Sequence, residues 1–194
     1  MKFNRTTISL VILALGLTSF VYFSEIKDQG FDITSKIDRV EDTREKIFSF
    51  DSKDIKSITI NLDFDREPKL MSFEKTKKGT WEMIQPEKLT ASDAAMAFLI
   101  NLFNQAQNTV EIPSTENTRE EYGLDTSNYK IQWTLDNGDK YEMILGKSNF
   151  DDTQIYAEVI FPDSVETTQN IFLVSKSFQY AIERDFDEWT INQE

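Results

Sequence analysis

The feature that most constrains the fold is a strict alternation of apolar and polar residues, which recurs in several short segments. In SITINLDF, residues 57–64, every second side chain is apolar, and Thr59, Asn61 and Asp63 lie between them. YKIQWTL, residues 129–135, has the same pattern. Successive side chains of a strand point to opposite faces, so each segment predicts a strand with one buried face.

Shorter segments carry the same signal and extend the predicted sheet. Apolar and polar residues alternate in LMSFEK (70–75) and in GTWEMI (79–84), and Lys78-Gly79 predicts a turn before the second segment. DNGD, residues 136–139, predicts a hairpin, because Asn-Gly adopts the twist that a tight hairpin needs. The remaining predicted strands are a return strand with Tyr141, Met143 and Leu145, then residues 155–161 and 171–175.

Two segments change to helical spacing. Residues 90–107, TASDAAMAFLINLFNQAQ, open with Thr90 and Asp93, a pair similar to a capping box. The apolar stripe predicted for this helix consists of Ala95, Phe98, Leu99, Leu102 and Ala106. In the second segment, residues 177–186, the predicted buried face consists of Phe178, Ala181 and Ile182.

The order of elements is several strands, a helix, several strands and a helix. We therefore predict an α+β fold: an N-terminal transmembrane helix, then an antiparallel β-meander domain with two covering helices. A duplicated β-meander-plus-helix unit is one interpretation of this order. The folded domain is expected to span residues 47–194.

The first 24 residues have a different character. TTISLVILALGLTSFVYFS, residues 6–24, carries no charge between Arg5 and Glu25. A helix of this length spans about 28 Å, close to the hydrocarbon thickness of about 30 Å in a bilayer. Residues 1–24 therefore predict a cytoplasmic tip and a single transmembrane anchor. The predicted anchor residues are Ile8, Leu10, Val11, Ile12, Leu13, Leu15, Leu17, Phe20, Val21, Tyr22 and Phe23.

The alternative for this segment is a cleaved signal peptide, because Lys2 and Arg5 give it a charged start. Residues 17–19 and 22–24 lack the alanines of a usual cleavage site, which favours an uncleaved anchor. Positive flanks stay in the cytoplasm, so the domain is expected in a periplasm or a thylakoid lumen, attached to a bacterial inner or thylakoid membrane. The charged residues 25–46 are predicted to form a stalk or linker.

Composition excludes several kinds of chemistry. The chain has no Cys and no His, which rules out disulfides, thiolate chemistry and Ser-His-Asp triads. The residues after position 24 hold 19 basic and 34 acidic side chains, a net charge of −15. Such a charge repels nucleic acid, so no nucleic-acid partner is expected, and a basic protein surface or a cation is a better neighbour.

Two acidic clusters are candidates for a cation site. One consists of Asp63, Asp65 and Glu67, and the other of Asp151 and Asp152. Calcium needs six to eight oxygen ligands, and neither cluster has the glycine and terminal glutamate of an EF-hand loop. Solvated loop charge is the simpler interpretation, and we predict neither a bound metal nor a cofactor.

Basic and nucleophilic residues offer little more. Lys176 lies between Ser175 and Ser177, but sequence neighbours face different directions, so a Ser–Lys dyad is not expected. The sequence Gly146-Lys147-Ser148 (146–148) lacks the upstream glycine of a phosphate-binding loop. The basic spot formed by Lys75, Lys77 and Lys78 is too small for a nucleic-acid site.

The segment REEYGLD, residues 119–125, could be a working site or the end of a helix. Thr118 with Glu121 predicts a capping box that opens a short helix. Gly123 suits the left-handed position that ends a helix, and Leu124 is then placed to pack back onto the last turn. The structural interpretation therefore accounts for the whole segment.

These motifs also carry a family resemblance. FSFDSKDIKSITI, GTWEMIQP, TASDAA, EEYGLD before a hairpin, IYAEV and IFLVSKS follow one another behind an apolar N-terminus and a charged stalk. In this order the chain resembles the bacterial family called domain of unknown function 4340, over about residues 45–185. Some members of that family occur with ABC-type transport and gliding-motility components, and others are single anchored proteins of cyanobacteria. The resemblance implies an accessory role outside the cytoplasm and supplies no catalytic residues.

The predicted function is a non-enzymatic accessory, scaffold or assembly subunit of a larger integral membrane protein complex. Trp81 and Trp133 lie on apolar strand faces and are expected in the core, whereas Phe186, Trp189 and Ile191 are candidate partner contacts. An alternative is a solute- or polymer-binding module of an ABC-type transport or gliding-motility system. A third hypothesis, a hydrolase that uses carboxylates alone, requires two close carboxylates in a cleft.

Overall fold

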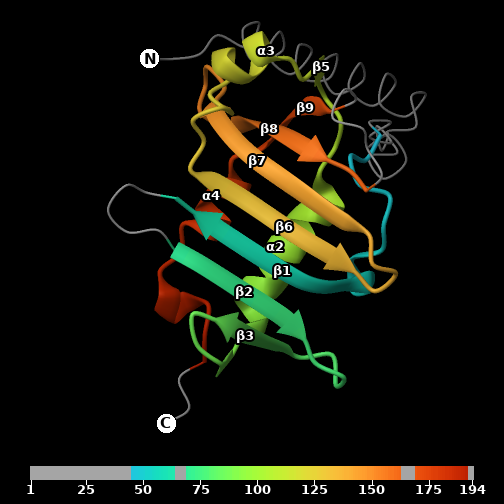
Figure 1. Ribbon diagram of the computed structural model, residues 1–194, viewed down its shortest axis with the longest axis vertical. Coiled ribbons are helices and arrows are strands. Elements are labelled where there is room, and N and C mark those ends of the chain that lie inside the picture. Colours follow the sequence, from blue (N-terminus) through green and yellow to red (C-terminus); the bar gives the residue numbers. More distant parts are fainter. Residues whose placement is uncertain (1–44, 64–68, 163–168, 192–194) are drawn as a thin grey trace, which may run out of the picture. The chain divides into compact units, whose positions relative to one another are not determined.

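The computed structural model describes residues 45–63, 69–162 and 169–191. The chain divides into a unit of residues 1–43, which lies outside the described residues, and a unit of residues 44–194. The second unit is built on one nine-stranded antiparallel sheet with the order β4-β3-β2-β1-β6-β7-β8-β9-β5 (Figure 1). Every pair of neighbouring strands in it is antiparallel.

Strands make up most of the regular structure. They are β1 (Ile55–Leu62), β2 (Lys69–Lys75), β3 (Trp81–Gln85), β4 (Leu89–Thr90), β5 (Glu111–Pro113), β6 (Tyr129–Leu135), β7 (Lys140–Ser148), β8 (Gln154–Ile160) and β9 (Asn170–Ser175). The helices are α2 (Asp93–Gln105), α3 (Glu116–Glu121) and α4 (Ser177–Ile182), with the 3-10 turns η1 (Ser52–Asp54) and η3 (Phe186–Glu188).

The predicted fold class is wrong. The described residues form a mostly antiparallel β-sheet protein with few helices, rather than the predicted α+β fold, for which a duplicated β-meander-plus-helix unit is one interpretation. The reason is that β1 pairs with β6 along nearly its whole length, which joins the two halves of the chain into one sheet. The short strands β4 and β5, which the sequence analysis does not predict, extend that sheet at both edges.

No helix among residues 45–63, 69–162 and 169–191 is long and apolar enough to cross a membrane. The transmembrane helix predicted within residues 6–24, with all of its anchor residues, lies outside the described residues, as does most of the predicted stalk.

The core fills one face of the sheet, where α2 and α4 pack (Figure 1). Phe103 of α2 lies against Trp133 of β6, with ring centroids 4.3 Å apart, and against Phe178 of α4 at 5.5 Å. The alternation predicted for β1 and β6 is confirmed, because Ile58, Ile60 and Leu62 and Ile131, Trp133 and Leu135 are all buried.

Helix α2 differs from its prediction in two respects. Its N-cap is Ser92, whose hydroxyl accepts a hydrogen bond from the Ala95 N–H at 3.4 Å, because Thr90 belongs to β4. The buried stripe includes Met96 and Phe103, whereas Phe98 is 40% exposed. The other predicted stripe residues are buried, so Phe98 alone lies off the buried face; they are Ala95, Leu99, Leu102 and Ala106.

The EYGLD segment ends α3 as predicted. Gly123 has a φ of +68°, and the N–H of Leu124 donates to the carbonyl of Arg119 at 2.8 Å, the bond that closes a Schellman motif. The capping box at the other end is formed by Thr115 and Thr118, so the prediction of Thr118 as the N-cap is wrong. The Thr118 hydroxyl instead accepts a hydrogen bond from the Thr115 N–H.

Candidate functional site on the uncovered face of the sheet

The second face of the sheet is the candidate functional surface. Figure 1 shows β2, β1, β6 and β7 in front of α2, with no described helix over them. We call the outward side chains of β3, β2, β1, β6 and β7 the open face. Antiparallel sheets often leave one face in water, so openness alone does not define a function.

Strand register arranges the open face in rows that cross the strands. The central row runs through directly opposed residues and consists of Gln85, Ser72, Thr59, Gln132 and Glu142. A second row consists of Glu82, Glu74, Ser57, Thr134 and Lys140. Polar residues on five neighbouring strands therefore form a continuous surface.

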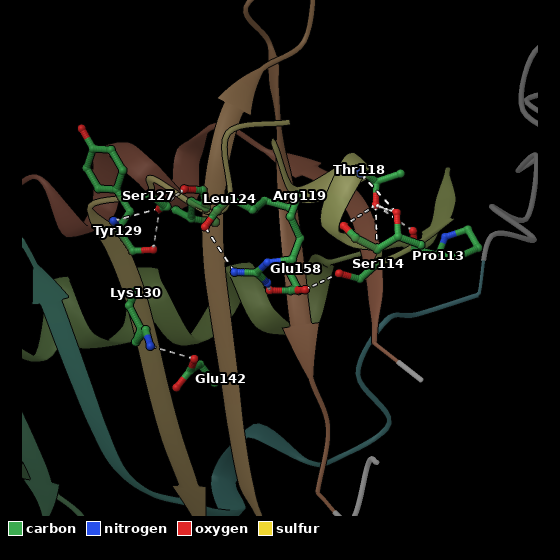
Figure 2. Close-up of polar contacts among 12 residues, drawn as sticks. Pro113, Ser114, Thr118, Arg119, Leu124, Ser127, Tyr129, Lys130, Glu142 and Glu158 are labelled. Atoms are coloured by element: carbon green, nitrogen blue, oxygen red, sulfur yellow. Dashed lines mark hydrogen bonds and ion pairs between the residues drawn. The ribbon is translucent and has the colours of Figure 1, made fainter. Parts of the chain in front are cut away.

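Side chains of the central row are bonded to one another. The Thr59 and Ser72 hydroxyls lie 3.2 Å apart, and the Gln132 amide donates to Glu142 at 2.6 Å. Lys130 forms an ion pair with Glu142 at 2.9 Å, which Figure 2 shows on the sheet surface. These bonds hold donors and acceptors in fixed positions before any partner binds.

The open face contains a shallow depression of about 370 Å³ over β1, β6 and β7. Hydroxyl, amide and charged side chains predominate among its lining residues, which include Thr59, Gln132, Thr134 and Lys140. Tyr141 borders it only from the core side, because it lies directly opposite the buried Trp133 and stacks on that ring with centroids 5.3 Å apart. Burial raises the pKa of the Tyr141 phenol, with the nearby Asp139 charge acting in the same direction, so this core-facing group stays protonated at neutral pH.

Helix α3 bounds the open face at the end near β8 and β9. Leu124 packs with Ile144 and Ile171, and Tyr122 stacks on Tyr156 with ring centroids 4.1 Å apart. This small apolar cluster is separate from the main core and covers the sheet where the polar rows end.

An ion pair between Arg119 and the buried Glu158 links α3 to β8 of the sheet. Glu158 of β8 has no exposed side-chain surface, and its carboxylate accepts hydrogen bonds from Arg119 of α3 and from the Ser114 hydroxyl (Figure 2). The Arg119 guanidinium also donates to the Leu124 carbonyl at 3.5 Å. Since a buried charge without partners is costly, this pair fixes the position of α3.

The predicted acidic candidates have local roles. Asp151 accepts hydrogen bonds from Thr153, which lower the pKa of Asp151. Asp152 is in ion-pair contact with Lys176. Asp65 and Glu67 lie outside the described residues. Among the described residues, no group of three side chains that could hold a metal ion occurs.

Lys176 does not form a dyad with its serine neighbours. Its ammonium contacts Asp152 and lies 5.6 Å from the Tyr180 ring centroid, while the Ser175 hydroxyl accepts a hydrogen bond from the Ser177 N–H at 3.2 Å. The bond to Asp152 raises the pKa of Lys176, which is the opposite of what a general base requires.

The three candidate partner contacts lie in different environments. Trp189 is fully buried and packs on Phe73 with ring centroids 5.1 Å apart. Phe186 is partly buried against the core, and Ile191 is 49% exposed. These residues therefore do not form one exposed patch, and the basic spot is also divided, because Lys75 donates to the Lys53 carbonyl at 2.6 Å.

The residues that shape this surface could not be identified from the sequence alone. The polar members of β1 and β6 were visible as the outward half of an alternation, but only strand order brings Thr59 beside Gln132. Glu158 carried a clearer signal, since an acidic residue between Ala157 and Val159 in an apolar strand indicates a buried ion pair.

Comparison with known proteins gives a family and no activity. The family described as a domain of unknown function (DUF4340) matches residues 81–192, more than half of the chain. No curated protein and no solved structure matches the sequence.

Proposed function

Because the chain belongs to the family described as a domain of unknown function (DUF4340), we propose its function from the surface of the sheet. It is a non-enzymatic accessory, scaffold or assembly subunit of a larger membrane protein complex, and it binds a partner protein through the open face. Apolar residues 6–24 support attachment to a membrane, with the domain outside the cytoplasm.

The observation that carries this proposal is the shape and chemistry of the open face. Small-molecule sites are usually concave and mostly apolar, whereas polar side chains predominate around this depression and continue in rows across five strands. A broad surface with fixed donors and acceptors suits the polar contacts of a protein interface.

Charge and location support the same proposal. A net charge of −13 favours a partner with a basic contact surface and accelerates its association. Confinement near the bilayer raises the effective concentration of the domain for membrane partners. Neither effect requires a reaction at the surface.

The test uses the tagged full-length protein, purified in a mild detergent. We expect a membrane protein complex of fixed stoichiometry to co-purify. Gln132→Arg, which adds a large cation to the centre of the open face, should reduce recovery of the partner at least tenfold. Thr126→Arg, at an exposed position in the loop after α3, is the matched control and should leave recovery unchanged.

Two results would overturn the proposal. One is a clean monomer at low salt, which would favour the alternative of a solute- or polymer-binding module. The other is a complex that forms equally well with Gln132→Arg. Circular dichroism of both variants must match the unmodified protein, so that loss of the partner is not loss of the fold.

A further inference from the structure

The edge of the sheet beside β5 contains an open stretch of strand. β5 pairs with β9 only where Glu111–Pro113 lies opposite residues 170–172. The chain before β5 turns away, and the N–H of Asn108 donates to the Glu45 carbonyl at 2.7 Å. Within the described part of the chain, no strand lies beside residues 173–175 on that side.

A depression of about 350 Å³ occupies this gap, and we call it the wedge. Its lining residues are Phe98, Asn101, Leu102, Gln105, Ala106, Gln107, Thr109, Thr153, Gln154, Leu173, Val174, Ser175, Ser177 and Phe178. The wedge therefore lies between the C-terminal half of α2 and the unpaired end of β9 (Figure 1 shows both elements).

Backbone groups of β9 face the wedge at alternate residues. The carbonyl of Gln169 accepts a hydrogen bond from the Ser114 N–H at 2.9 Å, and that of Leu173 accepts one from the Thr109 hydroxyl at 3.4 Å. Both bonds lie on the β5 side of the strand. Since backbone direction alternates along a strand, Ser175 also directs its N–H and carbonyl to that side, beyond the end of β5.

The wedge is free of charge. None of its lining residues is Asp, Glu, Lys or Arg, although these make up 28% of the chain. The amides of Asn101, Gln105, Gln107 and Gln154 supply both donors and acceptors. An ionic ligand would lose its hydration here without gaining a counter-charge.

We propose that the wedge binds an uncharged, extended polypeptide segment of a partner protein, which adds to the Leu173–Ser175 edge as a further strand. Backbone bonds to Ser175 provide affinity, because the Leu173 carbonyl already accepts from Thr109, and the amide side chains select against charged residues. The open backbone edge favours a peptide over an oligosaccharide, because peptide groups match the spacing of strand donors and acceptors. The inference rests on the proposed function only in that the partner is a protein.

A phage-displayed library of random heptapeptides is the probe, selected on the full-length protein in detergent micelles. Enriched peptides should be poor in Asp, Glu, Lys and Arg. Their binding should fall at least tenfold with Ser175→Pro, which removes a donor that faces the wedge and not β8. A second variant, Gln105→Glu, should weaken the same peptides, whereas the matched change Asn128→Asp, on an exposed loop, should not.

The proposal is overturned if no peptide is enriched, if enriched peptides are rich in charge, or if a folded Ser175→Pro protein binds them normally. Saturable binding of cellotetraose that Gln105→Glu abolishes, without any enriched peptide, would also overturn it. A membrane complex that depends on Gln132, found without any Ser175-dependent peptide, contradicts this inference and leaves the proposed function intact. Peptides whose binding depends on Ser175, found without any membrane complex, support this inference and contradict the proposed function.

Discussion

At the scale of single residues, the close approach of α3 to β7 depends on a glycine. The register of β7 and β8 shifts between Leu145 and Ser148. A Cβ at Gly146 would lie 2.2 Å from the Tyr122 carbonyl oxygen, which accepts a hydrogen bond from the Lys147 N–H at 2.8 Å. Residues 146–148, which lack the pattern of a phosphate-binding loop, therefore contact the C-terminal end of α3.

Gly146→Ala should therefore destabilise the domain by about 1–3 kcal/mol, because the methyl group overpacks this contact. Urea denaturation measures the loss, and faster hydrogen exchange at the Lys147 amide would locate it. Gly79→Ala is the comparison, since a Cβ there meets no atom within 4 Å and any cost comes from its φ of +83°. A Gly146→Ala protein as stable as the unmodified one would contradict this account.

The buried ion pair makes a second prediction at this scale. Arg119→Leu leaves the Glu158 carboxylate buried without its cation and should cost about 3 kcal/mol or more. The double variant Arg119→Leu with Glu158→Leu should recover most of that loss, because the apolar Ile144 and Ile171 lie directly opposite Glu158 on the neighbouring strands. Chemical denaturation of the single and double variants measures the coupling free energy between Arg119 and Glu158. Purely additive losses would contradict the prediction.

At the scale of elements, the N-terminal end of α2 shows which of two candidate residues caps the helix. Thr90 and Ser92 are both suitable residues, and sequence alone favoured Thr90 because of Asp93. Ser92→Ala should cost about 1 kcal/mol, whereas Thr90→Ala should cost less than half of that. Thermal or urea denaturation measures both losses, and the reverse order would contradict the observed cap.

The strand pair β2–β3 contains a local conflict. Glu74 lies directly opposite Glu82, and like charges in that position are destabilising. Glu82 has a partner in Lys88 at 3.1 Å, which leaves Glu74 as the better residue to change. Glu74→Thr should stabilise the domain by a few tenths to about 1 kcal/mol. The gain should shrink in 0.5 M salt, and a gain independent of salt would point to another cause.

At the scale of the whole molecule, sequence reasoning located most strands and missed how they assemble. The period-two signal is local, so it identified β1, β6 and their buried faces. Pairing of β1 with β6 joins segments about 70 residues apart and leaves no periodic signal in either. The open face and the wedge both arise from strand order, which is why neither was predicted.

The unit of residues 44–194 contains its own core, so we expect a fragment of that length to fold without residues 1–43. Its thermal unfolding should be cooperative, and near-ultraviolet circular dichroism should show ordered tryptophan side chains, because Trp133 and Trp189 are fully enclosed. A fragment with a broad transition and no near-ultraviolet signal would show that the first unit is required.

Residues 189 and 190 complete the N-terminal end of α2. Its carbonyl accepts a hydrogen bond from the Ser92 N–H at 2.8 Å, and Thr190 bridges to Ala91. The start of α2 is therefore completed by residues synthesised about a hundred positions later. During synthesis the start of α2 cannot acquire these contacts until residues 189 and 190 have left the ribosome.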